Sequence, residues 1–230
     1  MHKGIIIAID GPVAAGKGTI APELSQRLQG FYLYTGATYR CLALYCLEHG
    51  IDVTDKKEVI AQLSKIDIDL SEGKVILNGR EVTQEIKGIE VARNTPLVAG
   101  IPEVRHEMVR RQQKIGNTRR SEGQTVLVEG RDIATVVFPD AELKVFLTAT
   151  PEVRAQMRLE QHRIMGNSTV TFEDVLSDLQ KRDKEDTERA IDPLVKDPEN
   201  HGYFIVDNTG ITESETVAII IKELQKRNLL

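Results

Sequence analysis

The fold is decided by residues 5–19, which read Ile5-Ile6-Ile7-Ala8-Ile9-Asp10-Gly11-Pro12-Val13-Ala14-Ala15-Gly16-Lys17-Gly18-Thr19. An apolar run, a glycine-rich turn and a helix start follow one another here, which predicts a buried strand, a loop and a helix. Gly11, Gly16 and Lys17 fit the phosphate-binding pattern G-x-x-x-x-G-K. The hydroxyl residue that usually follows the lysine stands one place later, at Thr19.

This loop predicts a site for a nucleoside triphosphate. Its glycines let successive backbone N–H groups converge on a phosphate, at a helix N-terminus that already favours anions. Lys17 adds a positive charge for the β- and γ-phosphate oxygens, and the Thr19 hydroxyl can reach a magnesium ion. We expect ATP to contact nine consecutive residues: Gly11, Pro12, Val13, Ala14, Ala15, Gly16, Lys17, Gly18 and Thr19.

The composition is that of an ordinary globular protein and gives no sign of a nucleic-acid or membrane partner. Of the 230 residues, 40% are hydrophobic and 28% are charged, and 30 Lys and Arg stand against 35 Asp and Glu, a net charge of −5. No apolar run approaches the length of a membrane span. Aromatic residues make up only 4% of the chain and Trp is absent, which argues against a stacking surface for single-stranded nucleic acid. We also expect a monomer, because nothing in the sequence points to an obligate partner.

The cysteines and the first residues indicate a cytoplasmic protein. Cys41 and Cys46 are the only cysteines, and their spacing suits neither a zinc site nor a disulfide framework. We therefore predict that both are reduced residues of a helix. Met1-His2-Lys3-Gly4 leads directly into the first strand, so no secretory signal peptide is expected.

Four further apolar segments alternate with helical patterns along the chain. The apolar segments cover residues 31–34, 125–128, 143–147 and 203–206. The helical patterns cover residues 20–28, 37–49, 90–120, 151–166, 172–189 and 212–227. Five buried strands separated by helices predict a parallel sheet that is covered on both faces.

Residues 51–88 depart from this alternation. Thr54 is expected to cap a short helix. Residues 66–70 and 74–77 alternate apolar and polar side chains around a turn at Glu72-Gly73, which predicts a small antiparallel sheet inserted at about residues 64–86. A ligand-binding role for this sheet and a plain hairpin without one are equally open.

Polar side chains follow the predicted strands, at the edge of the sheet where parallel sheets bind ligands. They lie at Asp10, at Thr35, at residues 129–132 and at residues 207–209. Phosphoryl transfer depends on positioning and on neutralising charge. Because arginine grips phosphate with two parallel hydrogen bonds, Arg40 and Arg131 are candidates for holding an acceptor that carries its own phosphate.

Residues 182–189 supply further candidates. Their spacing places Arg182, Asp186 and Arg189 on one face of a helix. The pattern alone leaves open whether these three are functional or form solvated ion pairs. Surface exposure is expected for the other charged residues of this run, Lys181, Lys184, Glu185 and Glu188.

Five motifs, in order along nearly the whole chain, resemble those of the bacterial-type cytidylate kinases, a family of nucleoside monophosphate kinases with a phosphate-binding loop. In the first motif, glycine follows the loop lysine. The second is Thr35-Gly36-Ala37-Thr38-Tyr39-Arg40, and the third is Val104-Arg105 with Arg111-Gln112. The fourth is Gly130-Arg131-Asp132 with Thr135-Val136-Val137-Phe138-Pro139-Asp140-Ala141, and the fifth is Arg182-Asp183, Asp186 and Arg189 before Pro193-Leu194.

The resemblance implies a role for each matched residue. The acceptor phosphate would be held by Thr35, Arg40, Arg131 and Arg189. Arg105 and Asp132 would read the cytosine, and Arg182 and Asp186 would meet the ribose. Arg154 and Arg158 would contact ATP from a helical lid, and Mg²⁺ would be held by Thr19 and, through water, Glu129. The implied catalytic set is Lys17, Arg131, Arg158 and Arg189.

The chemistry of cytosine supports the role of Asp132 independently, whereas the role of Arg105 has an alternative. A carboxylate at Asp132 would accept a hydrogen bond from the amino group of cytosine and repel the carbonyl of uracil. Arg105 could instead form a surface ion pair with Glu103 or Glu107, and Arg163 is expected to be exposed to solvent.

Four positions depart from the family's pattern. Tyr34 stands where an aspartate usually precedes the second motif, and Pro96 replaces a serine thought to contact the base. Glu129 replaces an aspartate, and Ala134 replaces a glycine. None of these changes removes a phosphate ligand, so we expect activity to be retained.

The expected fold is α/β, a P-loop NTPase-type five-stranded parallel sheet flanked by helices, with the antiparallel insertion and a helical lid. Residues 1–230 would form one kinase unit with a core at about 1–36, 121–150 and 200–230. The monophosphate-binding part would span about 37–120, and the lid about 154–190. The expected reaction is Mg²⁺-assisted transfer from ATP to CMP or dCMP. Alternatives are another acceptor, such as UMP or a small alcohol, and a nucleotide-binding switch without kinase activity.

Overall fold

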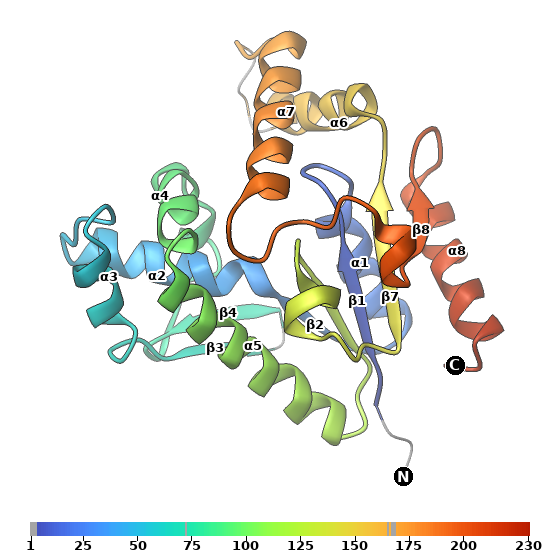
Figure 1. Ribbon diagram of the computed structural model, residues 1–230, viewed down its shortest axis with the longest axis horizontal. Helices are drawn as coiled ribbons and strands as arrows, with labels where there is room; N and C mark the ends of the chain where they lie inside the picture. Colours follow the sequence, from blue (N-terminus) through green and yellow to red (C-terminus); the bar gives the residue numbers. More distant parts are fainter. Residues whose placement is uncertain (1–3, 72, 165, 167–168) are drawn as a thin grey trace.

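The computed structural model describes residues 4–71, 73–164, 166 and 169–230. Its centre is a five-stranded parallel sheet in the order β2-β6-β1-β7-β8 (Figure 1). The strands are β1 (Ile6–Asp10), β2 (Phe31–Tyr34), β6 (Val126–Glu129), β7 (Leu143–Thr148) and β8 (Phe204–Asp207). The predicted α/β fold and its five parallel strands are confirmed.

Strand β1 is the middle of the sheet and is buried along its whole length. It pairs in parallel with β6 on one side and with β7 on the other. Ile6 and Ala8 belong to one apolar cluster, whereas Ile7 and Ile9 belong to another. Side chains of a strand point alternately to opposite faces, so both faces of the sheet are covered.

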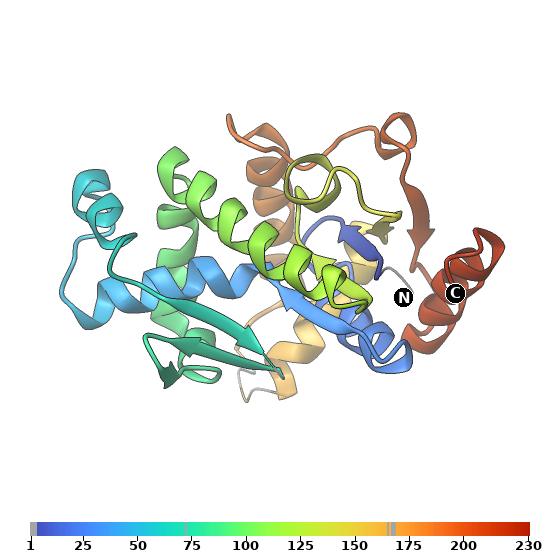
Figure 2. The same cartoon turned by 90° about the horizontal axis from the view of Figure 1, so that it is seen from below.

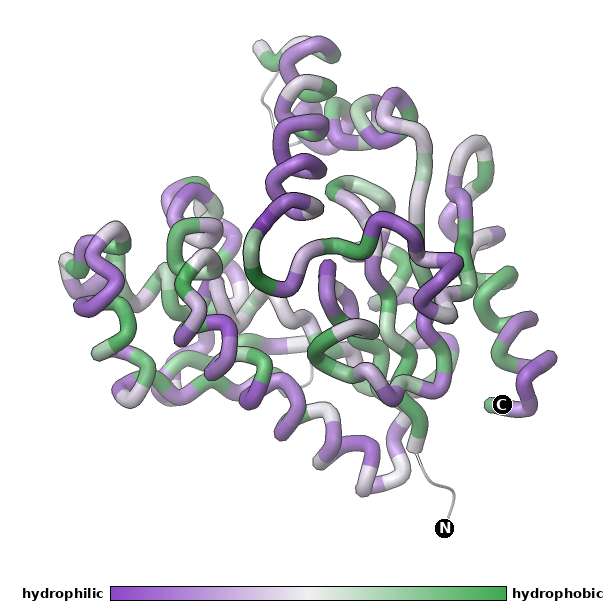
Figure 3. Tube along the Cα trace, viewed as in Figure 1, coloured by the Kyte–Doolittle hydropathy of each residue, from purple (hydrophilic) through white to green (hydrophobic). Residues whose placement is uncertain are grey.

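Different helices cover the two faces of the sheet. Apolar residues of α1 (Lys17–Arg27) and α8 (Glu213–Lys226) pack on the face of Ile7 and Ile9. Apolar residues of α2 (Thr35–Glu48) and α5 (Pro102–Ser121) pack on the face of Ile6 and Ala8. Figure 3 shows hydrophobic and hydrophilic residues alternating along these helices.

The inserted sheet is antiparallel, as predicted, and has three strands. They are β3 (Ile68–Ser71), β4 (Lys74–Leu77) and β5 (Arg80–Glu81). Figure 2 shows β3 and β4 on the side of the molecule occupied by α2 and α5, away from α8. Of the predicted turn, Gly73 has a positive φ of 76°, while Glu72 lies outside the described residues.

Two further helices, α6 (Pro151–Ile164) and α7 (Phe172–Glu188), pack on each other above the sheet in Figure 1. Their contact is a small apolar cluster of Ala155, Leu159, Val175 and Leu179. Most of the remaining surface of α7 is hydrophilic (Figure 3). The remaining elements are α3 (Lys56–Gln62), α4 (Ile89–Ala99), η1 (Glu85–Lys87), η2 (Ile133–Val137) and η3 (Pro198–His201).

One local prediction was wrong, and one predicted helical stretch is interrupted. The cap of α3 is Asp55, whose carboxylate accepts hydrogen bonds from Lys57 N and Glu58 N at 2.9 and 3.2 Å, while Thr54 bonds to Asp52. Residues 90–120 form two helices, α4 and α5, because the proline at the start of α5 disfavours helical backbone at the residue before it. That residue, Ile101, is extended, with φ −87° and ψ 122°.

The packing of α5 against the π-helical turn η2 gives a test of the fold. A Cβ at Gly116 would lie 2.5 Å from Phe138 Cζ, and the Phe138 ring is almost fully buried. Gly116→Ala should therefore lower the free energy of unfolding by about 1–3 kcal/mol in chemical denaturation. The control is Gly18→Ala in α1, where an added Cβ meets nothing within 4 Å. An equal effect of both substitutions would contradict this packing.

Candidate active site

A cavity of about 930 Å³ opens at the carboxyl ends of the central strands. It is lined by the phosphate loop, the starts of α1 and α2, the segment after β6 and part of α6. Fourteen residues predicted from the sequence line it: Ala14, Ala15, Gly16, Lys17, Gly18, Thr19, Thr35, Arg40, Arg105, Glu129, Arg131, Asp132, Arg158 and Arg189. Six predicted residues do not line it: Gly11, Pro12, Val13, Arg154, Arg182 and Asp186.

The phosphate loop takes a backbone shape that few sequences allow. A Cβ at Gly11 would collide with the carbonyl oxygen of Leu147 in β7, so the loop leaves β1 only through a glycine. Ala14 has a left-handed φ of 58°, which costs a residue other than glycine about 1–2 kcal/mol. Gly16, just before α1, also has a positive φ of 89°. The rest of the structure must hold this loop in place.

Lys17 is folded back onto the loop itself. Its ammonium donates hydrogen bonds to Gly11 O and Pro12 O, both at 2.7 Å. The side chain is buried, and this burial, reinforced by the nearby charge of Arg131, lowers the pKa of Lys17 to about 7. A polyphosphate in the cavity would favour the charged ammonium.

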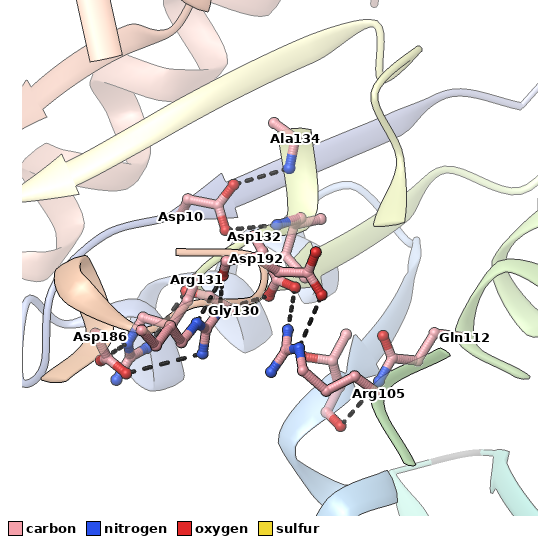
Figure 4. Close-up of polar contacts among 12 residues, drawn as sticks. Asp10, Arg105, Gln112, Gly130, Arg131, Asp132, Ala134, Asp186 and Asp192 are labelled. Atoms are coloured by element: carbon pink, nitrogen blue, oxygen red, sulfur yellow. Dashed lines mark hydrogen bonds and ion pairs between the residues drawn. The ribbon is translucent and has the colours of Figure 1, made fainter. Parts of the chain in front are cut away.

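Arg105 is buried within the site, where it contacts several other site residues, and is not a surface residue. It pairs with Asp132 through Nη2 and donates from Nε to Asp192 at 2.8 Å (Figure 4). Its guanidinium also lies over the Tyr39 ring, 5.7 Å from the centroid. Only 3% of Arg105 is exposed, and Glu107 is bound instead by two other arginines of α5. The alternative of a surface pair with Glu107 is therefore wrong.

Two further predicted arginines meet the same group of acids. Arg131 Nε donates to Asp186 Oδ2 at 2.6 Å (Figure 4). Arg189 donates from Nε to the backbone oxygen of Asp192 at 2.6 Å and lies 3.6 Å from Asp132. The structure thus brings Arg131, Asp132 and Arg189 together from segments that are far apart in the sequence.

The start of α2 is tied to the end of β6. Thr35 Oγ1 donates to Glu129 O at 2.7 Å, and Tyr32 donates to Glu129 Oε1 at 3.2 Å. Arg40 donates to Ile86 O at 2.8 Å and also interacts with the hydroxyl of Tyr34, which lines the cavity. The unusual Tyr34 therefore contacts a predicted phosphate ligand.

Asp10 connects the phosphate loop to the acidic segment after β6. Its carboxylate accepts hydrogen bonds from Ile133 N at 2.9 Å, from Ala134 N at 2.8 Å and from the Tyr203 hydroxyl at 2.8 Å. Figure 4 shows the bond to Ala134. Burial raises the pKa of Asp10, although these three donors oppose that shift.

Arg154 and Arg182 were expected in the site, but the structure places them outside the cavity. Arg154 donates to Ala149 O and Val13 O and pairs with Asp183. Arg182 pairs with exposed Asp178 one turn earlier in α7, whereas Asp186 contacts Arg131 and Arg189, which line the cavity. Arg158 lines the cavity, and Arg163 is exposed as expected.

Sequence reasoning gave no role to Asp192, Tyr203 or Gln112, although Gln112 belongs to the third motif. Gln112 is buried and donates to the hydroxyl of Thr38 at 2.8 Å. Asp192 has a left-handed φ of 49°, a conformation that Asp tolerates better than most residues. Its position before Pro193-Leu194 was the only local signal of a constrained turn.

Two negative findings concern the described part of the chain. No helix within it combines the length and the apolar character needed to cross a membrane. No three His, Cys, Asp or Glu side chains within it gather into a metal-binding cluster. Cys41 and Cys46 both lie in α2, as predicted, and are buried and free.

Comparisons with known proteins agree on one family. The family model described as Cytidylate kinase matches residues 7–226. The cytidylate kinase of Caldanaerobacter subterraneus subsp. tengcongensis is 40% identical over 220 residues, 96% of this chain and 94% of that protein. The cytidylate kinase of Clostridioides difficile is also 40% identical over 220 residues, 96% of this chain and 98% of that protein.

A solved structure supports the fold alone. It is an uncharacterized protein from Eubacterium ventriosum, with a TM-score of 0.54 at 12% identity. The match covers 96% of this chain and 98% of that one. At this low identity the likeness carries no statement about activity.

The state of Lys17 predicts proton uptake when ATP binds. With a pKa of about 7, unliganded Lys17 is mostly neutral at about pH 8 and mostly charged at about pH 6. ATP favours the charged form, so its binding should take up most of a proton at the higher pH and little at the lower one. ATP affinity should accordingly fall as the pH rises through 7.

Calorimetry of ATP binding in two buffers of different ionisation enthalpy measures this uptake. Lys17→Arg is the control, because arginine stays charged at both pH values. Equal proton uptake by the wild type and by Lys17→Arg would contradict the assignment.

Proposed function

The chain belongs to the cytidylate kinase family, and we propose that the cavity described above is its active site. The activity of this family is ATP-dependent phosphorylation of CMP and dCMP. The observation that carries the proposal is that one cavity is lined both by a phosphate loop and, besides Arg158 of α6, by four further arginines: Arg40, Arg105, Arg131 and Arg189. A site for ATP alone would not need this second group of cations.

The acceptor end would be held by cations that already have defined positions. Arg131 and Arg189 each contact Asp186, and Arg40 is fixed by Ile86 O. With Thr35, these three arginines would bind the phosphate of CMP, whose oxygens match the planar fork of a guanidinium. The acceptor oxygen would thereby be oriented toward ATP, which is the main task in phosphoryl transfer.

Cytosine would be read by Asp132 and Arg105. Their ion pair lines the cavity, and a carboxylate there accepts from the exocyclic amino group of cytosine. Asp186 would meet the ribose. Arg182 is proposed for the same task, which would require its guanidinium to leave Asp178.

The donor end would be formed by the loop residues 11–19. Lys17 would exchange its two loop carbonyls for phosphate oxygens of ATP. Lys17, Arg131, Arg158 and Arg189 would stabilise the charge on the transferring group, since a set of fixed donors needs little reorganisation. Arg154 would act through the loop and not on a phosphate.

Magnesium would be held by Thr19 and Glu129. Both line the cavity, and a hydroxyl with one carboxylate suits an ion that keeps several waters and phosphate oxygens as ligands. Bound Mg²⁺ would neutralise charge on the phosphates of ATP. The long side chain of Glu129 is steadied by Tyr32, which supports contact with the ion through water.

We further propose that α6 and α7, within about residues 154–190, act as a lid over a core of about 1–36, 121–150 and 200–230. The monophosphate-binding part would be about 37–120, with the sheet insertion at about 64–86. The helix pair has its own apolar cluster, which supports movement as a unit. We also propose a cytoplasmic location, which two buried thiols outside any disulfide support, and a monomer.

A panel of acceptors tests the function. With ATP and Mg²⁺ present, ADP release should depend on CMP or dCMP and should be far slower with UMP, AMP or a small alcohol. A coupled assay for ADP measures it. Turnover of UMP equal to that of CMP would refute the cytosine specificity, and ATP binding without acceptor-dependent ADP release would indicate a switch.

Asp132→Asn should weaken the preference for CMP over UMP. An amide can donate to the uracil carbonyl that the carboxylate repels, so the ratio of kcat/KM values should fall roughly tenfold, equivalent to ~1–3 kcal/mol. Steady-state kinetics with both acceptors measure the ratio. Asp140→Asn is a control for loss of an acid in the same segment, and an unchanged ratio in Asp132→Asn would refute base reading.

A further inference from the structure

Two oppositely charged side chains of the helix pair hold one residue of the phosphate loop. Arg154 of α6 donates from Nη1 to Val13 O at 2.8 Å, and Asp183 of α7 accepts from Val13 N at 3.2 Å. The two side chains also pair with each other, with 2.7 Å between Arg154 Nη1 and Asp183 Oδ2. Both backbone polar groups of Val13 are therefore bound from outside the loop.

Apolar contacts accompany these polar ones. Val13 and Ala14 pack against the cluster that joins α6 to α7, which contains Ala155 and Leu179. Arg154 is only 4% exposed, and its Nε is fixed by Ala149 O at 3.1 Å at the end of β7. The contact is thus a built and mostly buried junction between the helix pair and the loop.

The position of this junction along the loop is informative. Val13 does not line the cavity, whereas each residue from Ala14 to Thr19 does. The neighbour of Val13 is Ala14, whose left-handed φ of 58° is unfavourable for alanine. Fixing both polar groups of Val13 sets the direction in which the chain enters that turn.

We propose that Arg154 and Asp183 form a brace that holds the phosphate loop in the shape that receives ATP, so that both are positioning residues and Arg154 is not a phosphate ligand. This proposal rests on the proposed function only in naming ATP as the ligand. The brace joins three elements: Arg154 comes from α6, Asp183 from α7 and Val13 from the loop after β1. When the helix pair is seated on the loop, the loop is shaped for the triphosphate.

The chemistry of the two side chains explains why they are an arginine and an aspartate. Arg154 serves three acceptors at once, the oxygens of Ala149, Val13 and Asp183, which a lysine cannot do in a planar arrangement. Asp183 uses one oxygen for Val13 N and the other for Arg154. In an amide at position 183, an NH₂ group would replace one of the two carboxylate oxygens. This donor would then face the donor of either Val13 N or Arg154.

The brace and plain electrostatics predict opposite effects of removing the charge of Asp183. A negative charge near a polyphosphate site repels ATP, so its removal alone would strengthen ATP binding. Loss of the brace would instead weaken ATP binding. The sign of the change therefore separates the two explanations.

The experiment is calorimetry of a non-hydrolysable ATP analogue with Mg²⁺ and, separately, of CMP. Asp183→Asn should weaken binding of the analogue ~tenfold, the loss expected for one charge-assisted hydrogen bond, and should leave CMP binding within about twofold. The matched control is Glu185→Gln, the same change on an exposed residue of α7 that pairs only weakly with Lys181. Hydrogen exchange at the Val13 amide should accelerate in Asp183→Asn alone.

A second variant, Arg154→Lys, provides the measurement if Asp183→Asn folds poorly. Arg154→Lys keeps the charge but loses the forked donors, and it should weaken analogue binding in the same direction. Unchanged or tighter analogue binding in both variants overturns the brace, as does an equal loss of CMP affinity. A wild type that binds the analogue but does not phosphorylate CMP would refute the proposed function and leave the brace measurable.

Discussion

The site depends first on the buried carboxylate of Asp10. It lies at the end of the central strand, next to the glycine from which the phosphate loop departs. By accepting from Ile133 N and Ala134 N, it fixes the turn that follows Arg131 and Asp132. A buried carboxylate is costly unless donors surround it, so a shift of this turn would leave Asp10 without two of its three hydrogen-bond donors. One side chain thereby sets the distance between the loop expected to bind ATP and the residues expected to bind CMP.

Around that fixed point, the cations of the site are kept in place by acids. Arg105 rests on Asp132 and Asp192, and Arg131 rests on Asp186. Removing one partner from such a pair would leave an uncompensated charge, which is far less favourable than the intact pair. The acids therefore serve two purposes: they balance the arginines when no phosphate is bound, and they orient the guanidinium groups in advance of binding.

The sequence predicted those parts of the structure that depend on local residue patterns. The alternation of strands and helices predicted the parallel sheet, and the loop motif predicted one side of the cavity. The split between α4 and α5 was also visible in principle, since Pro102 marks it. Contacts across long separations were not predictable in this way: Arg105 meets Asp192 across 87 residues, and Arg154 meets Val13 across 141. Arg158, which lines the cavity, and Arg154, which binds a loop carbonyl, have the same sequence signature, so only the fold separates them.

These contacts place the phosphate loop between two supports of different character. On the side of the sheet, the network of Asp10 and the packing of Gly11 against β7 join the loop to the rigid core. On the other side, its apex is held by a helix pair with a small apolar cluster of its own. A loop held only by the core would keep one shape whether or not the helix pair was seated. Because Val13 is bound by both helices, the shape of the loop depends on their position, and a lid that withdraws from ATP would also loosen the residues that bind it.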